Sequence, residues 1–502
     1  MTRGVESVAI VGRDAPLWMA AAVLQRSLGG AGVHIQVVEL PSLLSPVDCY
    51  STLPSLGSMH RMLGVDEAKM LEVASGVPVA AQRFSNWAQG SHPYLVAYDD
   101  EPGESGDLPF TQYWLKGHSE GLRAGIEEFS VGCASARLGR VPLAGSGPDV
   151  EVSASYGYNL DARDYSEALK RLVTKRGIST LSGRIADVKL DGERIISVEL
   201  EDGSSVEADL FVDASGVERA LMMRLPGAQF HSWRDRFATD RILTASAASF
   251  KSLPAFTEIS AFRAGWIGIH PLRDRTAITA VYSSNDMPDQ AMIAQLSLLA
   301  RLPVAGEAVV AESQPGMLEQ AWIGNCVAVG EAAVVIEPLD AVPLHVAQGC
   351  ISHLVTLFPA IAQQMPEARP YNERILAFAA NIADFTQAHY RLNRRFDEKF
   401  WDQSRDAQAT PALQRKIDLF SARGAVALGD HETFSEQNWA LLFLGGGIQP
   451  ESYDPRIDLL SEELLIAKVQ QRLHTVAELA KSMPTVDRFV GAVRQLQAAG
   501  VN

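Results

Sequence analysis

The stretch Ser7-Val-Ala-Ile-Val-Gly12 decides how the chain begins to fold. It is a β-branched run that ends in glycine. Pro16-Leu-Trp-Met-Ala-Ala-Ala-Val-Leu24 follows it and has the apolar content of a buried helix, with a proline in its first turn. Val33-His-Ile-Gln-Val-Val-Glu39 then predicts a second buried strand that ends in a carboxylate. Together these segments predict a β-α-β unit at the start of the chain.

The turn between the first strand and the helix is where such a unit binds the diphosphate of a dinucleotide. It normally carries G-x-G-x-x-G, because backbone amides must approach the pyrophosphate, and an acidic residue about 20 positions further on holds the ribose. Gly12 is the first glycine here, but Asp14 and Leu17 take the other two glycine positions. Glu39 lies where the ribose carboxylate belongs. These residues alone leave open whether the unit binds a nucleotide or is a bare β-α-β unit.

Two later segments repeat the pattern of a strand that runs into a turn of small residues. Residues 194–216 alternate like two strands joined by an Asp-Gly turn, and they end in Asp213-Ala-Ser-Gly216. Cys326-Val-Ala-Val-Gly-Glu-Ala-Ala333 has the same form around Gly330 and Glu331. Three such turns predict one nucleotide-binding domain that is assembled from separated pieces of chain.

The length of 502 residues corresponds to roughly three domains at about 150 residues each. The C-terminal stretch repeats apolar residues at helical spacing and predicts packed helices. We therefore expect three parts: a nucleotide-binding domain of residues 1–82, 155–225 and 320–365, a substrate domain of residues 83–154 and 226–319, and a helical region of residues 366–502.

Charge and cysteine content narrow the class of protein. The chain has 44 basic and 60 acidic residues and a formal net charge of −16, which predicts poor binding to nucleic acid and to anionic membranes. Its four cysteines have no CxxC spacing, so no metal site is expected. No run of eighteen apolar residues predicts a membrane span. We expect a cytoplasmic protein.

Short motifs then follow one another in a characteristic order: Trp18-Met-Ala-Ala21, Leu63-Gly-Val-Asp-Glu67, Arg83-Phe-Ser-Asn-Trp87, Gly265-Trp-Ile267, Pro338-Leu339, Phe400-Trp401 and Gly445-Gly-Gly-Ile-Gln-Pro450. Together they resemble the flavin-dependent tryptophan halogenases, which share their architecture with flavin monooxygenases of the hydroxybenzoate hydroxylase type. The resemblance implies an α/β fold with a Rossmann-like FAD-binding domain, an interleaved substrate domain and C-terminal helices. It also implies FAD, a separate flavin reductase and an aromatic small molecule as partners, and a homodimer is a further expectation.

The resemblance also assigns roles to single positions. The cofactor-binding positions it implies are Gly12, Glu39, Asp213, Gly216, Gly330 and Glu331. The lysine that guides hypohalous acid in the family corresponds to Val79, whose isopropyl group can neither hydrogen-bond HOCl nor form a chloramine.

Two further family motifs are altered. In the family's W-x-W-x-I-P motif, Trp266 keeps the first tryptophan and Gly268 replaces the second, which predicts open space. In the E-S-T-G motif, Asp340 keeps the carboxylate, while Val342 and Pro343 replace the Thr-Gly pair that binds chloride. Proline has no N–H to offer an anion.

Three hypotheses remain open at this point. The first is a halogenase-like flavoprotein with diverged or lost halogenation that binds an aromatic or indole-like ligand. The second is a non-catalytic relative that keeps the fold as a scaffold or binding subunit. The third is a flavin monooxygenase that transfers oxygen directly, in the space that Gly268 opens. An active enzyme would be an FAD-dependent oxidoreductase.

Overall fold

The strand β1 (Ser7–Gly12) lies inside a parallel sheet, as its uninterrupted apolar sequence predicts. The computed structural model describes residues 4–88, 92–99, 108–143 and 155–498. The chain divides into two units, one of residues 1–75, 160–234 and 314–380, and the other of residues 76–159, 235–313 and 381–502. We call them the first and the second unit.

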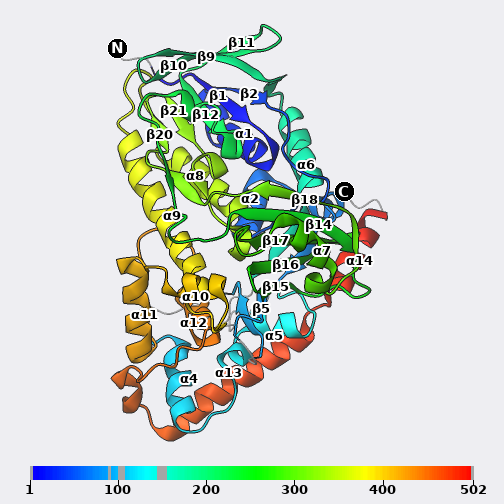
Figure 1. Ribbon diagram of the computed structural model, residues 1–502, viewed down its shortest axis with the longest axis vertical. Coiled ribbons are helices and arrows are strands. Elements are labelled where there is room, and N and C mark those ends of the chain that lie inside the picture. The colour runs from blue at the N-terminus through cyan, green and yellow to red at the C-terminus, as the bar shows by residue number, and fades with distance from the viewer. Residues whose placement is uncertain (1–3, 89–91, 100–107, 144–154, 499–502) are drawn as a thin grey trace. The chain divides into compact units, whose positions relative to one another are not determined.

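The first unit is built on the sheet that contains β1. Within the described residues its strand order is β20 (Trp322–Ile323), β21 (Cys326–Ala328), β12 (Leu210–Ala214), β1, β2 (His34–Glu39) and β8 (Ser179–Ser182). All neighbours are parallel except β20 and β21. Figure 1 shows β1, β2, β12 and β21 together, with α1 beside them. The predicted β-α-β unit is confirmed.

The helices of the first unit pack their apolar residues against this sheet and each other. The helix α1 (Asp14–Leu28) buries most of its residues, including Leu17 and Trp18, and contacts α6 (Ala162–Thr174) and α8 (Pro343–Thr356). A small antiparallel sheet contains β9 (Ile185–Asp191), β10 (Arg194–Leu200) and β11 (Ser205–Glu207). Strands β10 and β11 form the hairpin that the Asp202-Gly203 turn predicts.

The second unit is built on a larger mixed sheet. Across the described residues its order is β18 (Val304–Glu312), β14 (Arg241–Ala248), β17 (Arg275–Tyr282), β16 (Gly265–Pro271), β15 (Phe256–Phe262), β5 (Ala81–Ser85) and β6 (Tyr94–Ala97). One face packs on α7 (Asp289–Ala300) through a cluster that includes Ile267, Ile269 and Leu296. The strand β16 is buried along its whole length.

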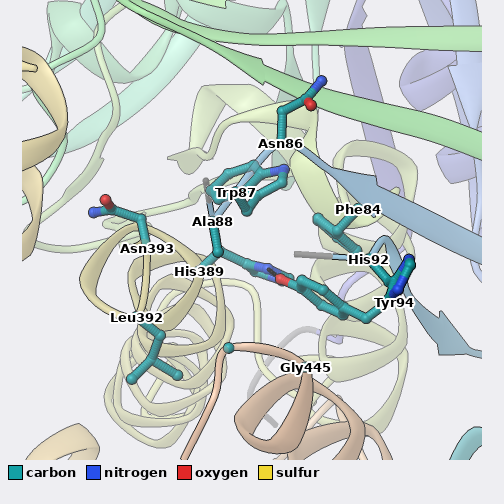
Figure 2. Close-up of a pocket in the computed structure, with 11 residues that line it drawn as sticks. Phe84, Asn86, Trp87, Ala88, His92, Tyr94, His389, Leu392, Asn393 and Gly445 are labelled. Atoms are coloured by element: carbon teal, nitrogen blue, oxygen red, sulfur yellow. Dashed lines mark hydrogen bonds between the residues drawn. The ribbon is translucent and has the colours of Figure 1, made fainter. Parts of the chain in front are cut away.

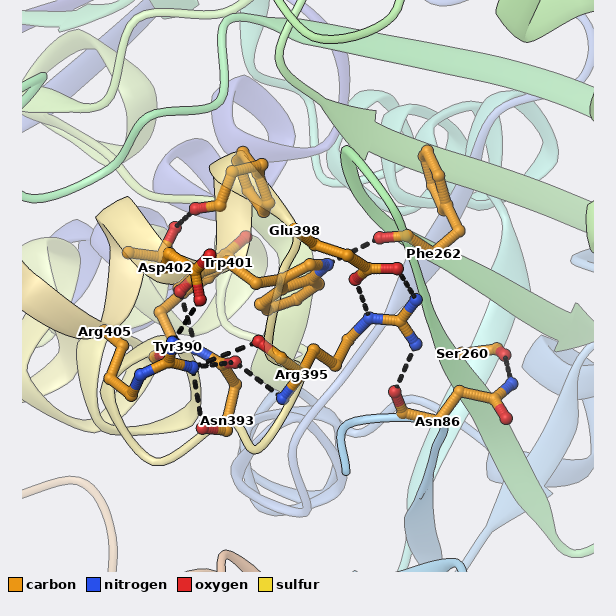
Figure 3. Close-up of polar contacts among 12 residues, drawn as sticks. Asn86, Ser260, Phe262, Tyr390, Asn393, Arg395, Glu398, Trp401, Asp402 and Arg405 are labelled. Carbon is orange, nitrogen blue, oxygen red and sulfur yellow. Dashed lines mark hydrogen bonds and ion pairs between the residues drawn. The ribbon is translucent and has the colours of Figure 1, made fainter. Parts of the chain in front are cut away.

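The C-terminal part is helical, as its apolar spacing predicts. After α9 (Ala368–Arg391) it contains α10 (Lys399–Asp406), α11 (Pro411–Arg423), α12 (Glu436–Gly445), α13 (Glu462–Ser482) and α14 (Val486–Ala498). Figure 3 shows how polar contacts bind the segment around α10 to the sheet. The Trp401 indole donates to the Phe262 carbonyl at 2.6 Å, and Arg395 bridges Glu398 and the Asn86 carbonyl.

Candidate functional site

The turn after β1 requires glycine at its first position. Gly12 pairs with Ala214 on β12 and with Glu39 on β2, and a Cβ added to it would collide with the Ala214 carbonyl. Gly12 therefore lets the ends of two parallel strands approach closely, which is where a Rossmann-like sheet receives its ligand.

The backbone amides of this turn are largely engaged by the protein itself. The Arg13 N–H donates to the Ala214 carbonyl at 3.2 Å, and the Leu17 N–H donates to the Arg13 carbonyl at 3.4 Å. Pro16 has no N–H. Burial raises the pKa of Tyr50 well above its ordinary value, and a hydrogen bond from the Ala15 backbone opposes the rise, so the Ala15 N–H is the donor there. Few amides of the turn are therefore left for a diphosphate.

Asp14 adopts the backbone geometry of the glycine that it replaces. Its φ is +56°, in the left-handed region that favours glycine. Burial raises the pKa of its carboxyl, while hydrogen bonds from the Ser42 side chain and the Leu43 backbone oppose the rise. The turn therefore holds a partly buried acid in a backbone conformation that favours glycine.

We expect Asp14→Gly to raise the affinity for FAD by about tenfold, because removal of one carboxylate near a diphosphate is worth about 1.4 kcal/mol. Glycine accepts the φ of +56° without strain. Leu17→Gly is expected to destabilise the protein by about 3 kcal/mol instead, since Leu17 is fully buried within α1. Flavin fluorescence titration and chemical denaturation measure the two effects. If Asp14→Gly binds FAD with unchanged affinity, the Asp14 carboxylate does not weaken FAD binding.

Glu39, at the ribose position, already has partners. Both of its carboxylate oxygens accept from the Lys170 ammonium at 2.8 Å, and the Ser182 hydroxyl donates to one of them at 3.1 Å. A ribose would have to share this carboxylate with Lys170. Its role in cofactor binding stays a prediction.

Asp213 organises the turn that follows β12. Its buried carboxylate accepts from the Ser215 amide and hydroxyl and from the amides of Leu221 and Met222, at 2.6–3.0 Å. Gly216 opens the next short helix at φ +72°. The side chain of Asp213 therefore shapes the backbone of this turn.

Glu331 adds to the acidic character of the same edge of the sheet. Gly330 precedes it at φ +61° and begins a 3₁₀ turn (Gly330–Ala332) after β21. Desolvation by the surrounding protein raises the pKa of Glu331, Arg219 opposes the rise, and Asp14 and Asp48 reinforce it. Arg219 is therefore the cation that balances several carboxylates here.

The residues at the family's chloride motif lie where α8 begins. Asp340 and Val342 are buried, and Pro343 is the first residue of α8. A proline fits this helix position well because the first-turn N–H has no helical partner. Pro343 therefore leaves no backbone N–H at this position for an anion.

Val79 and Trp266 both lie in the interior of the second unit. Val79 ends β4 (Val77–Val79), pairs with Gly157 on β7 (Gly157–Asp161) and is fully buried. The Trp266 indole donates to the Tyr390 hydroxyl at 2.8 Å and is also fully buried. Neither side chain presents an ionisable group.

The prediction of open space at Gly268 is wrong. A Cβ built on Gly268 would lie 2.6 Å from Nε2 of His270, two residues along β16. The imidazole folds over the glycine on the same face of the strand, since side chains alternate with a period of two. Burial lowers the pKa of His270 to about 4, helped by Arg275, so the imidazole is neutral at pH 7.

An aromatic cluster of the second unit leaves only a small hollow (Figure 2). Phe84 stacks on Tyr94 and on His389, with ring centroids 5.1 and 4.3 Å apart, and the Trp87 ring contacts Phe84 in a T-shaped arrangement. The hollow has about 10 Å³, which is enough for one water molecule. The cluster is packed core and has no room for an indole.

A larger cavity of about 420 Å³ lies in the first unit, beside the turn after β1. Its charged lining residues are Arg13, Arg184, Glu201, Glu218, Arg219 and Arg224. The volume falls in the range of small-molecule sites. Its size and its arginines match the phosphates of a nucleotide better than the small aromatic hollow does.

The fold and these turns define an α/β protein with a dinucleotide-type sheet, and comparison with known proteins identifies the family. The family model for tryptophan halogenases matches residues 7–462, so the chain belongs to the tryptophan halogenase family. It is 26% identical to the tryptophan 7-halogenase KtzQ of Kutzneria sp. (strain 744), over 98% of this chain and 99% of that protein.

Solved structures agree. The flavin-dependent halogenase BrvH from Brevundimonas sp. BAL3 superposes with a TM-score of 0.91 at 27% identity, covering 97% of this chain and 99% of the other. Xcc4156, a flavin-dependent halogenase from Xanthomonas campestris, gives 0.89 at 27% identity, covering 99% and 98%. The fold is thus the Rossmann-like, FAD-binding type with a helical C-terminal region.

Membership of a flavin-dependent family implies FAD, and such enzymes typically need a separate flavin reductase. The residues of the first unit fit that cofactor unevenly. The engaged turn amides and Asp14 oppose a diphosphate, whereas the cavity arginines favour one. Among the described helices, none is long and apolar enough to cross a bilayer. Within the same residues, no group of three or more His, Cys, Asp or Glu side chains could hold a metal ion.

Four residues that shape these sites were not predicted from the sequence, three in the first unit and one in the second. Tyr50 engages an amide of the turn, Arg13 and Arg219 line the cavity, and His270 fills the space at Gly268. Arg13 directly follows the first glycine, which was a usable signal. Tyr50 and Arg219 act through neighbours that are distant in the sequence, whereas the effect of His270 on Gly268 depends on its side-chain rotamer.

Proposed function

We propose that this chain is a flavoprotein of the tryptophan halogenase family that has lost the family's lysine-dependent halogenation. The observation that carries the proposal is the buried hydrocarbon side chain at the lysine position, Val79 on β4. Halogen transfer through an amine needs a nucleophilic nitrogen, and valine has none. The motif changes at Val342 and Pro343 support the same conclusion, because both groups of the halide route are altered together.

Two other lysines are poor substitutes for the one replaced by Val79. The Lys116 ammonium donates to the Tyr453 hydroxyl and to Asp458, at 3.0 and 2.9 Å. Lys69 lies on the exposed side of α3 (Glu67–Val73). An ammonium held by a carboxylate stays protonated and is a weak nucleophile.

A non-catalytic binding or assembly role is the second candidate. It is favoured by the engagement of the turn amides by Ala214 and Tyr50, which weakens the usual diphosphate cradle. Direct oxygen transfer loses its main support, since His270 fills the space expected at Gly268. An aromatic or indole-like ligand, a homodimer and a cytoplasmic location remain proposals.

A reductase-coupled assay with FAD, chloride or bromide, and tryptophan or indole tests the proposal. We expect no halogenated product by mass spectrometry from the wild type or from Val79→Lys, because Pro343 offers no N–H to a halide. Val79→Lys/Val342→Thr/Pro343→Gly, if folded by circular dichroism, should give measurable product.

Reductase without the protein is the control for free hypohalous acid. Halogenated product from the wild type would overturn the proposal. Product from Val79→Lys alone would refute the role assigned to Val342 and Pro343. Saturable FAD binding without product favours lost halogenation, and the absence of any flavin binding favours the scaffold.

A further inference from the structure

The cavity beside the turn after β1 is unusually basic for this chain. Four arginines and two glutamates line it, a net charge of about plus two, in a protein of formal net charge −16. Glu218 is half exposed and pairs with Arg13 at 2.5 Å. A concave, positively charged site concentrates anions from solution.

Arg13 is held in this cavity with an unused donor. Its side chain is more than nine-tenths buried, and its Nε finds no hydrogen-bond partner among the residues that the structure describes. Leaving a buried donor unpaired is costly, so such a group calls for a ligand. The Glu218 contact engages only one terminal nitrogen, which leaves the fork of the guanidinium incomplete.

Arg219 is a second lining arginine with a buried, unused donor. It has a left-handed backbone, φ +48°, in the turn after β12, and its guanidinium lies 3.9 Å over the Phe230 ring. Its Nε is likewise buried with no partner in the described part of the chain. Backbone strain and an orphan donor in one residue point to a function.

The turn after β1, where the glycine motif would bind a diphosphate through backbone amides, adjoins this cavity, because Arg13 belongs to both. The amides of Arg13, Ala15 and Leu17 are engaged within the protein, so the backbone offers little to an anion. Arg13 lies between the first two glycine positions of the motif, and its side chain lines the cavity directly. Guanidinium groups can therefore bind the phosphates in place of the backbone amides, and they suit phosphate better than any other side chain.

We propose that Arg13 and Arg219 bind the diphosphate of a nucleotide in this cavity, in place of the glycine-rich backbone cradle. A diphosphate diester carries two negative charges, which match the net charge of the lining. The inference deepens the proposed function, because a flavoprotein of this family would use the site for FAD. It is also testable apart from flavin, because ADP presents a diphosphate on adenosine without a flavin.

The test is calorimetric titration of the full chain with FAD, ADP and riboflavin. Arg13→Met and Arg219→Met should each weaken ADP and FAD binding by at least about tenfold, and riboflavin binding should not change. Arg369→Met, an exposed arginine of the same unit, is the matched control and should bind like the wild type. Raising the salt concentration should weaken ADP binding to the wild type more than to either Met variant.

Glu218→Gln is a second test of the site, in case Arg13→Met does not fold because Arg13 is buried. It frees Arg13 without disturbing the core, so ADP should bind several-fold more tightly. If the wild type binds ADP but not riboflavin or FAD, and the Met variants lose ADP, the diphosphate site stands and the flavoprotein function fails. If FAD binds equally to the wild type and both Met variants, the site is refuted while the flavoprotein function stands. No ADP binding at any concentration up to millimolar also refutes it.

Discussion

Replacing Asp213 by alanine is expected to lower the free energy of unfolding by about 3–5 kcal/mol, because the loss of one buried carboxylate leaves several buried donors unpaired. The donors are the amides of Ser215, Leu221 and Met222 and the Ser215 hydroxyl. Asp213→Asn keeps one acceptor oxygen in place and should cost about half as much. Guanidinium denaturation followed by circular dichroism measures both.

The same pair of variants separates two roles for Asp213. If the side chain shapes the turn, stability and nucleotide affinity fall together. If it contacts a ligand, Asp213→Ala would lose affinity at an unchanged unfolding midpoint, which would contradict the structural role. Asp202→Ala is the control, since Asp202 lies in the exposed hairpin turn of the same unit and bonds only to Ser204 in the contacts described.

His270 should make the protein sensitive to acid. Its pKa is about 4 in the folded protein, below the ordinary value of 6.5, because burial disfavours the imidazolium. The unfolded chain therefore binds the proton first as the pH falls. The stabilisation that neutral His270 gives the folded protein is fully present above pH 6.5 and is lost as the pH falls from about 6.5 to about 4. It amounts to about 3 kcal/mol.

His270→Ile should remove this part of the pH dependence. The free energy of unfolding, measured at pH 7 and at pH 4.5, should fall less in His270→Ile than in the wild type, by about 2–3 kcal/mol. His60 and His345 have similarly lowered pKa values and contribute equally to both proteins, so they cancel in the comparison. His34→Gln, at an exposed position, should behave like the wild type. If the free energy of unfolding falls equally between pH 7 and pH 4.5 in His270→Ile and in the wild type, His270 is not a neutral, buried imidazole.

Much of the fold could be predicted from local pattern. The strands at Ser7–Gly12 and His34–Glu39 and the hairpin around Gly203 follow from apolar periodicity and turn residues. The segment α4 (Phe110–Ser119) is helical although it begins with aromatic and β-branched residues, which favour strands. Its aromatic residues pack on Phe129, Leu465 and Val469, and this tertiary burial outweighs their strand propensity.

The candidate site was only partly predictable. The absence of a lysine at Val79 and of an N–H at Pro343 is visible in the sequence, because each depends on the identity of one residue. The filling of the space at Gly268 was not, because it depends on the rotamer of His270 two residues away.

The sequence by itself determined the β-α-β opening, the three small-residue turns and the altered motifs, since these depend on neighbouring residues along the chain. Only the tertiary structure decided that Ala214 and Tyr50 engage the amides of the first turn, and that Arg13 and Arg219 line one cavity. Those contacts join residues far apart in the sequence. Their geometry is set by the pairing of β1 with β12 and by the packing around it, which no local pattern encodes.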